Sequence, residues 1–155
     1  METALGIDMI VFQVAEDNLR MQLRHPAMMI GTDADAVAPT GPLSKGLPHP
    51  RHYGTYPRVL ARYVREESLL SLEEAIWKMS GLAAQRLRWT ERGLVKKGYR
   101  ADLVVLDPDI VADRATYEKP HQYPVGVSHV IVNGQVVVDH GIHTQARPGK
   151  VLGRP

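Results

Sequence analysis

Apolar residues recur at helical spacing in the first part of the chain. Between residues 57 and 67, Val59, Leu60 and Tyr63 share one face of a helix, and the arginines lie mostly on the other face. A helix is also predicted over residues 17–24, because acidic and capping side chains open it and a residue followed by proline leaves the helical region.

A further helical region follows Ser71. Glu74 lies three residues after Ser71, which is the spacing of a capping box. Gly81 is expected to end this helix as its C-cap, and a short helix is predicted over residues 82–87. We interpret these helices as structural, because none of them carries a set of ligands.

Two short apolar runs, at residues 9–12 and 27–30, predict strands near the start of the chain. With the helix between them they form a strand–helix–strand unit, the repeat of a parallel α/β fold. Asp33 closely follows the second run, so a carboxylate lies at the carboxyl end of the expected strand. Chemistry in barrel and open α/β enzymes is held at such strand ends. Ordinary turn formation explains Asp33 equally well.

The second half of the chain predicts a small β-module. Residues 101–108 form one expected strand. Residues 127–132 and 135–139 flank an Asn-Gly pair, which favours a two-residue hairpin turn between β-branched runs. The tail, residues 141–155, shows no periodicity and is expected to lie on the surface or to be partly mobile.

Composition narrows the class of protein. The 155 residues suit one ordinary domain, and hydrophobic and charged fractions of 44% and 23% are typical of globular chains. The net charge is only +2 and the basic residues are scattered, which argues against a nucleic-acid partner. There is no cysteine, so disulfides and thiolate ligands are excluded. Without an apolar run of about eighteen residues or a signal-peptide pattern, no membrane association and a cytoplasmic location are expected.

The segment between the predicted strand at residues 27–30 and the helix at 57–67 is the best candidate for chemistry. It is rich in proline, glycine and alanine, and a loop this long is usually functional or disordered. Several side chains that can take part in catalysis or binding cluster toward its end: His49, Arg51, His52 and Tyr53.

Three blocks of sequence together resemble one family. They are Gly31-Thr32-Asp33 followed by HPR at residues 49–51 and GTYPRVL at 54–60; AIWKMSG at 75–81; and GYRADLVVLDP at 98–108 followed by VIVNG at 130–134. These blocks resemble the C-terminal part of the D-aminoacylase (N-acyl-D-amino-acid deacylase) family, within the amidohydrolase superfamily. The resemblance runs over nearly the whole chain.

The resemblance implies an α/β fold made of the C-terminal portion of an amidohydrolase (β/α)8 barrel followed by a small β-module. A complete barrel needs about 250 residues, so the barrel is expected to be incomplete. Residues 1–92 would supply the barrel strands and helices, and residues 93–155 the β-module and tail.

The same resemblance implies a metal-dependent hydrolase that acts on C–N (amide) bonds, with N-acyl-D-amino acids as substrates. Asp33 matches the family's aspartate that orients or deprotonates a water bound to zinc or another divalent metal. From loop position and chemistry, we expect Arg51 to bind a substrate carboxylate, with His49 and Tyr53 beside it.

The chain departs from the family in its metal ligands, since it contains no His-x-His pair. The remaining candidates for a rebuilt metal site are Asp33, Asp35, His25, His49 and His52. For each histidine alone, an ordinary surface or loop position is the more frequent explanation.

Three interpretations therefore stay open. The chain is a truncated hydrolase with a rebuilt metal site, active on amides or esters; or an incomplete fragment or subunit whose partner chain carries the missing histidines; or a binding module without catalysis. A homodimer or a partner chain is expected in the first two cases, because an incomplete barrel exposes sheet edges and apolar faces.

Overall fold

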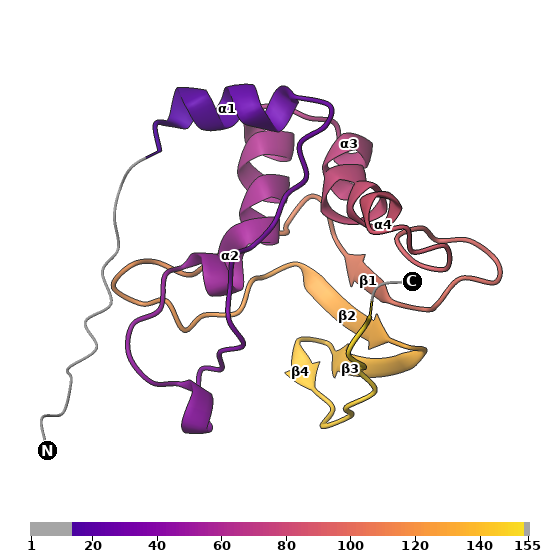
Figure 1. Ribbon diagram of the computed structural model, residues 1–155. Helices are drawn as coiled ribbons and strands as arrows, with labels where there is room; N and C mark the ends of the chain where they lie inside the picture. Colours follow the sequence, from indigo (N-terminus) through magenta and orange to yellow (C-terminus); the bar gives the residue numbers. More distant parts are fainter. Residues whose placement is uncertain (1–13, 154–155) are drawn as a thin grey trace, which may run out of the picture.

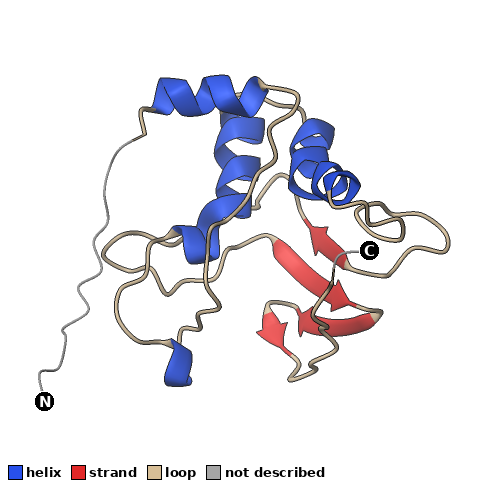
Figure 2. Cartoon of the chain, in the orientation of Figure 1, coloured by secondary structure: helices blue, strands red, loops and turns tan. Residues whose placement is uncertain are grey.

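The computed structural model describes residues 14–153, and in these residues a helical part lies beside one four-stranded antiparallel sheet (Figure 1, Figure 2). The helical elements are α1 (Glu16–Arg24), η1 (Gly41–Leu43), α2 (Arg51–Arg58), η2 (Val59–Glu66), α3 (Leu72–Ile76), η3 (Trp77–Gly81) and α4 (Leu82–Arg86). The strands are β1 (Leu103–Leu106), β2 (Val127–Val132), β3 (Gln135–Asp139) and β4 (Ile142–His143). The strand predicted at residues 9–12 lies outside the described residues. No helix in the described part of the chain is both long and apolar enough to span a membrane.

The helix predicted over residues 57–67 is confirmed but begins earlier, at Arg51, where α2 starts. Pro57 lies inside α2, although proline lacks the N–H that a helix interior uses. Directly after it the helix widens into the π-helical turns of η2, and the N–H of Val59 is shared between two carbonyls. Proline and π-helical turns are both recognised causes of irregular geometry within a helix.

The capping box is confirmed. The Ser71 hydroxyl accepts the Glu74 N–H at 3.1 Å, and the Glu74 carboxylate accepts the Ser71 N–H at 2.9 Å. The C-cap predicted at Gly81 is wrong, because Gly81 has helical dihedral angles and the helix continues from η3 into α4. A Cβ at this position would lie 2.3 Å from the Trp77 ring and 3.3 Å from the Gly93 carbonyl oxygen, so glycine permits a close approach here.

The strand predicted at residues 27–30 does not form, and the parallel α/β unit predicted with it is wrong for the described residues. Among residues 14–153 no strand lies beside this segment, and the Ile30 N–H donates instead to the Lys78 carbonyl at 3.1 Å. Ile30 is nevertheless buried in the core. The apolar run therefore reports burial against helices rather than a sheet ladder.

The sheet has the order β1-β2-β3-β4, with every neighbouring pair antiparallel. The predicted β2–β3 hairpin is confirmed, and Asn133 and Gly134 both have the positive φ of a primed turn, 46° and 79°. The tail, expected to be irregular, also contributes the short strand β4. None of the residues in the four strands is fully buried.

The core lies in the helical part and its connections. The buried residues that form it are Leu23, Ile30, Val59, Leu60, Tyr63, Leu70, Ala75 and Val111. They come from α1, η2, α3 and three loop segments, so the core joins pieces that are far apart in the sequence.

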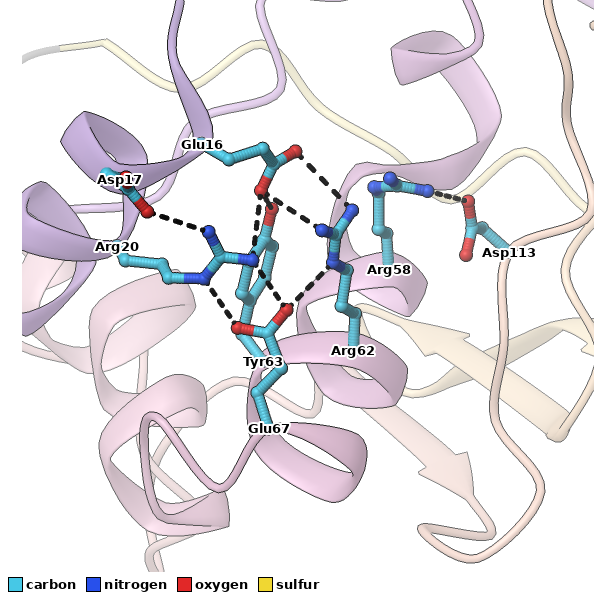
Figure 3. A network of polar contacts seen from close by, with 8 residues as sticks. All are labelled: Glu16, Asp17, Arg20, Arg58, Arg62, Tyr63, Glu67 and Asp113. Carbon is cyan, nitrogen blue, oxygen red and sulfur yellow. Dashed lines mark hydrogen bonds and ion pairs between the residues drawn. The ribbon is translucent and has the colours of Figure 1, made fainter.

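An ion-pair network fastens α1 to η2 and the residue that follows it (Figure 3). The Glu67 carboxylate accepts two hydrogen bonds from Arg20, at 2.8 and 3.0 Å, and a third from Arg62 at 3.0 Å. Glu16 lies on the other side of the same guanidiniums, 3.3 Å from Arg62, and accepts the Tyr63 hydroxyl at 3.1 Å. The hydrogen bonds from Arg20 and then Arg62 lower the pKa of Glu67 from 4.5 to about 2.

We predict that this network makes stability depend on acid pH. Because the folded-state pKa of Glu67 is depressed, its contribution to the free energy of unfolding is present above pH 4.5 and is lost as the pH falls toward 2. Glu67→Gln should remove this part of the pH dependence, as measured by urea unfolding at a series of pH values.

Glu91→Gln is the matched control, because Glu91 forms an exposed ion pair with Arg100 at 3.1 Å. It should leave the pH profile close to that of the original chain. Equal flattening by both substitutions would show that the Glu67 network does not cause the acid sensitivity.

Candidate functional site

The structure brings two of the predicted site residues together. Asp33 lies in the loop between α1 and η1, and Arg51 is the first residue of α2. A carboxylate oxygen of Asp33 is 2.9 Å from Nη2 of Arg51. The Asp33 side chain is 87% exposed, so the pair is open to solvent and to ligands. Asp33 has a φ of 48°, in the left-handed region that aspartate enters more readily than most residues.

The three histidines among the candidate metal ligands are engaged in local hydrogen bonds. His25, His49 and His52 each use Nδ1 to accept a backbone N–H, from Ala27 at 3.3 Å, Arg51 at 3.0 Å and Asp35 at 3.1 Å respectively. An Nδ1 that accepts must be unprotonated, so Nε2 carries the proton of the neutral ring. In this arrangement neither ring nitrogen is free to bind a metal.

The predicted ligand set therefore does not form a metal centre in the described part of the chain. A metal centre needs at least three His, Asp or Glu side chains whose ligand atoms lie close together. Within residues 14–153, none of the five candidates belongs to such a group with ligand atoms within 4.8 Å of one another. A zinc site needs at least three converging protein ligands. The five residues do not fit such a site as they stand, and their role in metal binding remains a prediction.

His49 is held neutral at the edge of the loop. Burial lowers its pKa below 6.5, and electrostatic interactions with Arg51 and then His52 lower it further. Its Nε2 lies 3.4 Å from the Tyr117 hydroxyl, and the two rings meet edge to face with centroids 5.2 Å apart. A neutral imidazole here can donate a hydrogen bond without adding charge to the site.

Tyr53 is turned toward a different loop. Its hydroxyl lies 3.0 Å from Nδ1 of His121, and Nε2 of His121 lies 3.0 Å from the Gly46 carbonyl oxygen. Because the Gly46 carbonyl can only accept, His121 carries its proton on Nε2 and accepts the Tyr53 hydroxyl. Burial raises the pKa of Tyr53. These bonds tie the candidate loop to residues 117–123, and the substrate contact of Tyr53 remains a prediction.

A cavity of about 520 Å³ opens beside the Asp33–Arg51 pair. Its walls are mainly apolar side chains: Leu19, Leu23, Met28, Ile30 and Val59. Its polar lining includes His49, Arg51, Arg58, Asp113 and Tyr117, and Arg58 pairs with Asp113 at 3.4 Å. This volume and this mixture of apolar and polar side chains suit a small organic ligand.

Sequence reasoning missed Asp113, Tyr117 and His121 as neighbours of the loop. They lie in the connection between β1 and β2, which shows no periodicity, and they meet the loop only through tertiary packing. No sequence pattern indicates that contact.

Comparison with known proteins gives consistent matches. The sequence profile of the amidohydrolase family matches residues 16–138. The N-acyl-D-aspartate deacylase of Alcaligenes xylosoxydans xylosoxydans is 43% identical over 143 residues, which are 92% of this chain and 27% of that protein.

Solved structures agree. The crystal structure of D-aminoacylase superimposes with a TM-score of 0.81 at 42% identity, covering 90% of this chain and 28% of that one. The N-acyl-D-glutamate deacylase of Bordetella bronchiseptica was solved with zinc and a phosphonate mimic of the tetrahedral intermediate. It superimposes with a TM-score of 0.78 at 42% identity, covering 91% of this chain and 28% of that one. The chain therefore spans little more than a quarter of the length of these relatives.

The contacts of the loop predict which substitutions disturb the fold. Tyr53→Phe removes a partly buried hydrogen bond to His121 and should lower the free energy of unfolding by about 1 kcal/mol. Asp33→Asn breaks only an exposed ion pair and should change the free energy of unfolding by less than about 0.5 kcal/mol. Urea unfolding of both variants checks this, and a larger loss for Asp33→Asn would mean that Asp33 has a structural role.

Proposed function

The chain belongs to the amidohydrolase family, and we propose that it forms the substrate-facing part of a metal-dependent hydrolase that cleaves the amide bond of N-acyl-D-amino acids. The observation that carries the proposal is the exposed Asp33–Arg51 pair beside a cavity of small-molecule size. The deacylases to which the chain is similar act, by their names, on N-acyl-D-aspartate and N-acyl-D-glutamate.

Arg51 would bind the carboxylate of the substrate. A guanidinium presents five N–H donors in a fixed fork, so Arg51 can hold Asp33 through one nitrogen and still offer donors to a second carboxylate. Arg51 lines the cavity, so a substrate held there would lie against its apolar wall. The neutral imidazole of His49 next to Arg51 can donate a hydrogen bond to the substrate without repelling the arginine.

Asp33 would handle a proton during hydrolysis. Zinc or another divalent metal, when bound, lowers the pKa of a coordinated water toward neutrality. Asp33 presents an exposed carboxylate, 2.9 Å from Arg51, that can accept a proton. The converging metal ligands would come from polypeptide outside the described residues, either another segment of a longer protein or a partner chain.

The exposed surface of the sheet also favours contact with polypeptide outside the described residues. In the part of the chain that the structure describes, the sheet has no fully buried residue, and its outer strands β1 and β4 each pair on one side only. Val104, Val105, Val136 and Ile142 are exposed apolar side chains of its strands. Exposed apolar strands at an open edge pair readily with another strand. A second copy of this chain, a partner chain or a further segment would cover them.

Complementation tests the proposal directly. This chain would be mixed with a D-aminoacylase that lacks the segment matched here, with zinc added, and hydrolysis of an N-acetyl-D-amino acid would be followed. We expect hydrolysis from the mixture and none from either piece alone. Hydrolysis by this chain alone, abolished by a chelator, would favour the rebuilt metal site, whereas inertness of the mixture would favour a binding module.

Within that mixture, Asp33→Asn should lower kcat by about 100-fold or more, because it removes a general base while keeping the shape of the side chain. The unfolding midpoint of the variant serves as the control for an intact fold. A variant with an unchanged rate would remove Asp33 from the mechanism.

Arg51→Ala should raise KM for a carboxylate-bearing substrate by about tenfold, from the loss of a charged hydrogen bond, and should affect a neutral ester less. Arg86→Ala is the matched control, since Arg86 is an exposed arginine on α4. An equal rise for acid and ester would show that Arg51 does not bind the carboxylate.

A further inference from the structure

Three side chains that commonly bind metals converge on the β-module, away from the loop of Asp33. His129 on β2 and Asp139 on β3 are direct partners in the antiparallel register, and His140 follows Asp139. Nε2 of His129 lies 3.2 Å from a carboxylate oxygen of Asp139, and Nε2 of His140 lies 3.8 Å from the same oxygen. One ligand atom from each residue lies within 4.8 Å of the other two.

The hydrogen bonds around His129 direct a lone pair toward Asp139. The Ser128 hydroxyl donates to the Val105 carbonyl at 3.2 Å, so its oxygen is free to accept the Nδ1–H of His129 at 3.0 Å. In the neutral ring, Nε2 is then unprotonated and faces a carboxylate oxygen at 3.2 Å. Two lone pairs at that separation repel unless a cation, either a proton or a metal ion, lies between them.

A tight turn brings the third ligand to this point. His140 has a φ of 46° and Gly141 a φ of 80°, so the chain reverses between β3 and β4 through left-handed residues. The His140 and His129 rings are packed at 66° to each other, with centroids 4.7 Å apart. The His140 side chain is 80% exposed, so it can rotate without disturbing the core.

We propose that His129, Asp139 and His140 bind one divalent transition-metal ion of the zinc or copper class. Tetrahedral bonds of about 2.0–2.1 Å place ligand atoms about 3.3 Å apart, which the His129–Asp139 distance already matches. Two imidazoles and one carboxylate suit zinc or copper rather than magnesium or calcium, which prefer oxygen ligands. Asp139 is 57% exposed, so at least one coordination position would face solvent.

Ser128 would act as a positioning residue for this site. A metal-binding histidine usually donates its second ring N–H to a neighbouring acceptor, which holds the ring in the binding tautomer. The Ser128 hydroxyl takes this place for His129, and its own donation to Val105 anchors it to β1. The site therefore joins β1, β2, β3 and the turn that follows β3.

Calorimetric titration of the full chain with zinc chloride tests the proposal. We expect one zinc ion per chain, with binding lost in His129→Gln and in His140→Asn. Asparagine is chosen at residue 140 because it tolerates a positive φ and so preserves the turn. Ser128→Ala should weaken binding about tenfold, as loss of a supporting hydrogen bond to a ligand typically does.

His143→Asn is the matched control, because His143 is an exposed histidine on the neighbouring strand β4 outside the cluster. Its affinity for zinc should equal that of the original chain. Histidine ring signals in NMR spectra locate the ion independently, and those of His129 and His140 should move on zinc addition. Absence of zinc binding, or binding that survives both ligand substitutions while the signals of His49 or His52 move, would overturn the proposal. The site is independent of the proposed hydrolase activity.

Discussion

The position of α1 depends on one carboxylate held between two guanidiniums. A helix of nine residues is too short to be stable by itself in water, so it must be held by the rest of the molecule. Glu67 adds to the hold that the buried Leu23 gives, because it binds Arg20 from α1 and Arg62 from η2 at the same time. Glu16 completes the arrangement from the α1 side (Figure 3). With α1 in place, its apolar residues form part of the cavity wall.

A second contact sets where the candidate loop begins. Lys78 is only 5% exposed, and its ammonium donates to the His25 carbonyl at 2.6 Å. The Lys78 carbonyl in turn accepts the Ile30 N–H. Both ends of the segment that precedes Asp33 are thus bound to the helix that contains Lys78. A buried ammonium without such a partner would be costly, so the contact also explains why a lysine is tolerated in this interior position.

The helical part and the sheet differ in how well their apolar side chains are buried. The helical part has a buried core and a closed set of ion pairs, whereas the sheet has exposed apolar strands and open edges. The same contrast holds for chemistry, since the loop holds an aspartate and an arginine, and no described residues converge there as metal ligands. Both features agree with a chain that spans about 28% of the length of D-aminoacylase.

Local interactions were readable from the sequence, and contacts between distant segments were not. The Ser71 capping box and the Asn133-Gly134 turn each depend on residues a few positions apart, so pattern and propensity were sufficient. The family could also be recognised, because its motifs are contiguous. The apolar run at residues 27–30 indicated burial but could not show whether another strand lay beside it. Gly81 suggested a helix C-cap, and the sequence could not show the Trp77 ring packed against it.

Only the tertiary structure decided which of the polar residues meet. His129 and Asp139 are brought together by strand register. Arg51, the first residue of α2, lies beside Asp33 in the folded chain. The loop histidines looked like ligands in the sequence, yet backbone N–H groups occupy their Nδ1 atoms. The physical reason is that side-chain identity establishes what a residue can bind, whereas the folded backbone determines which partners come within reach.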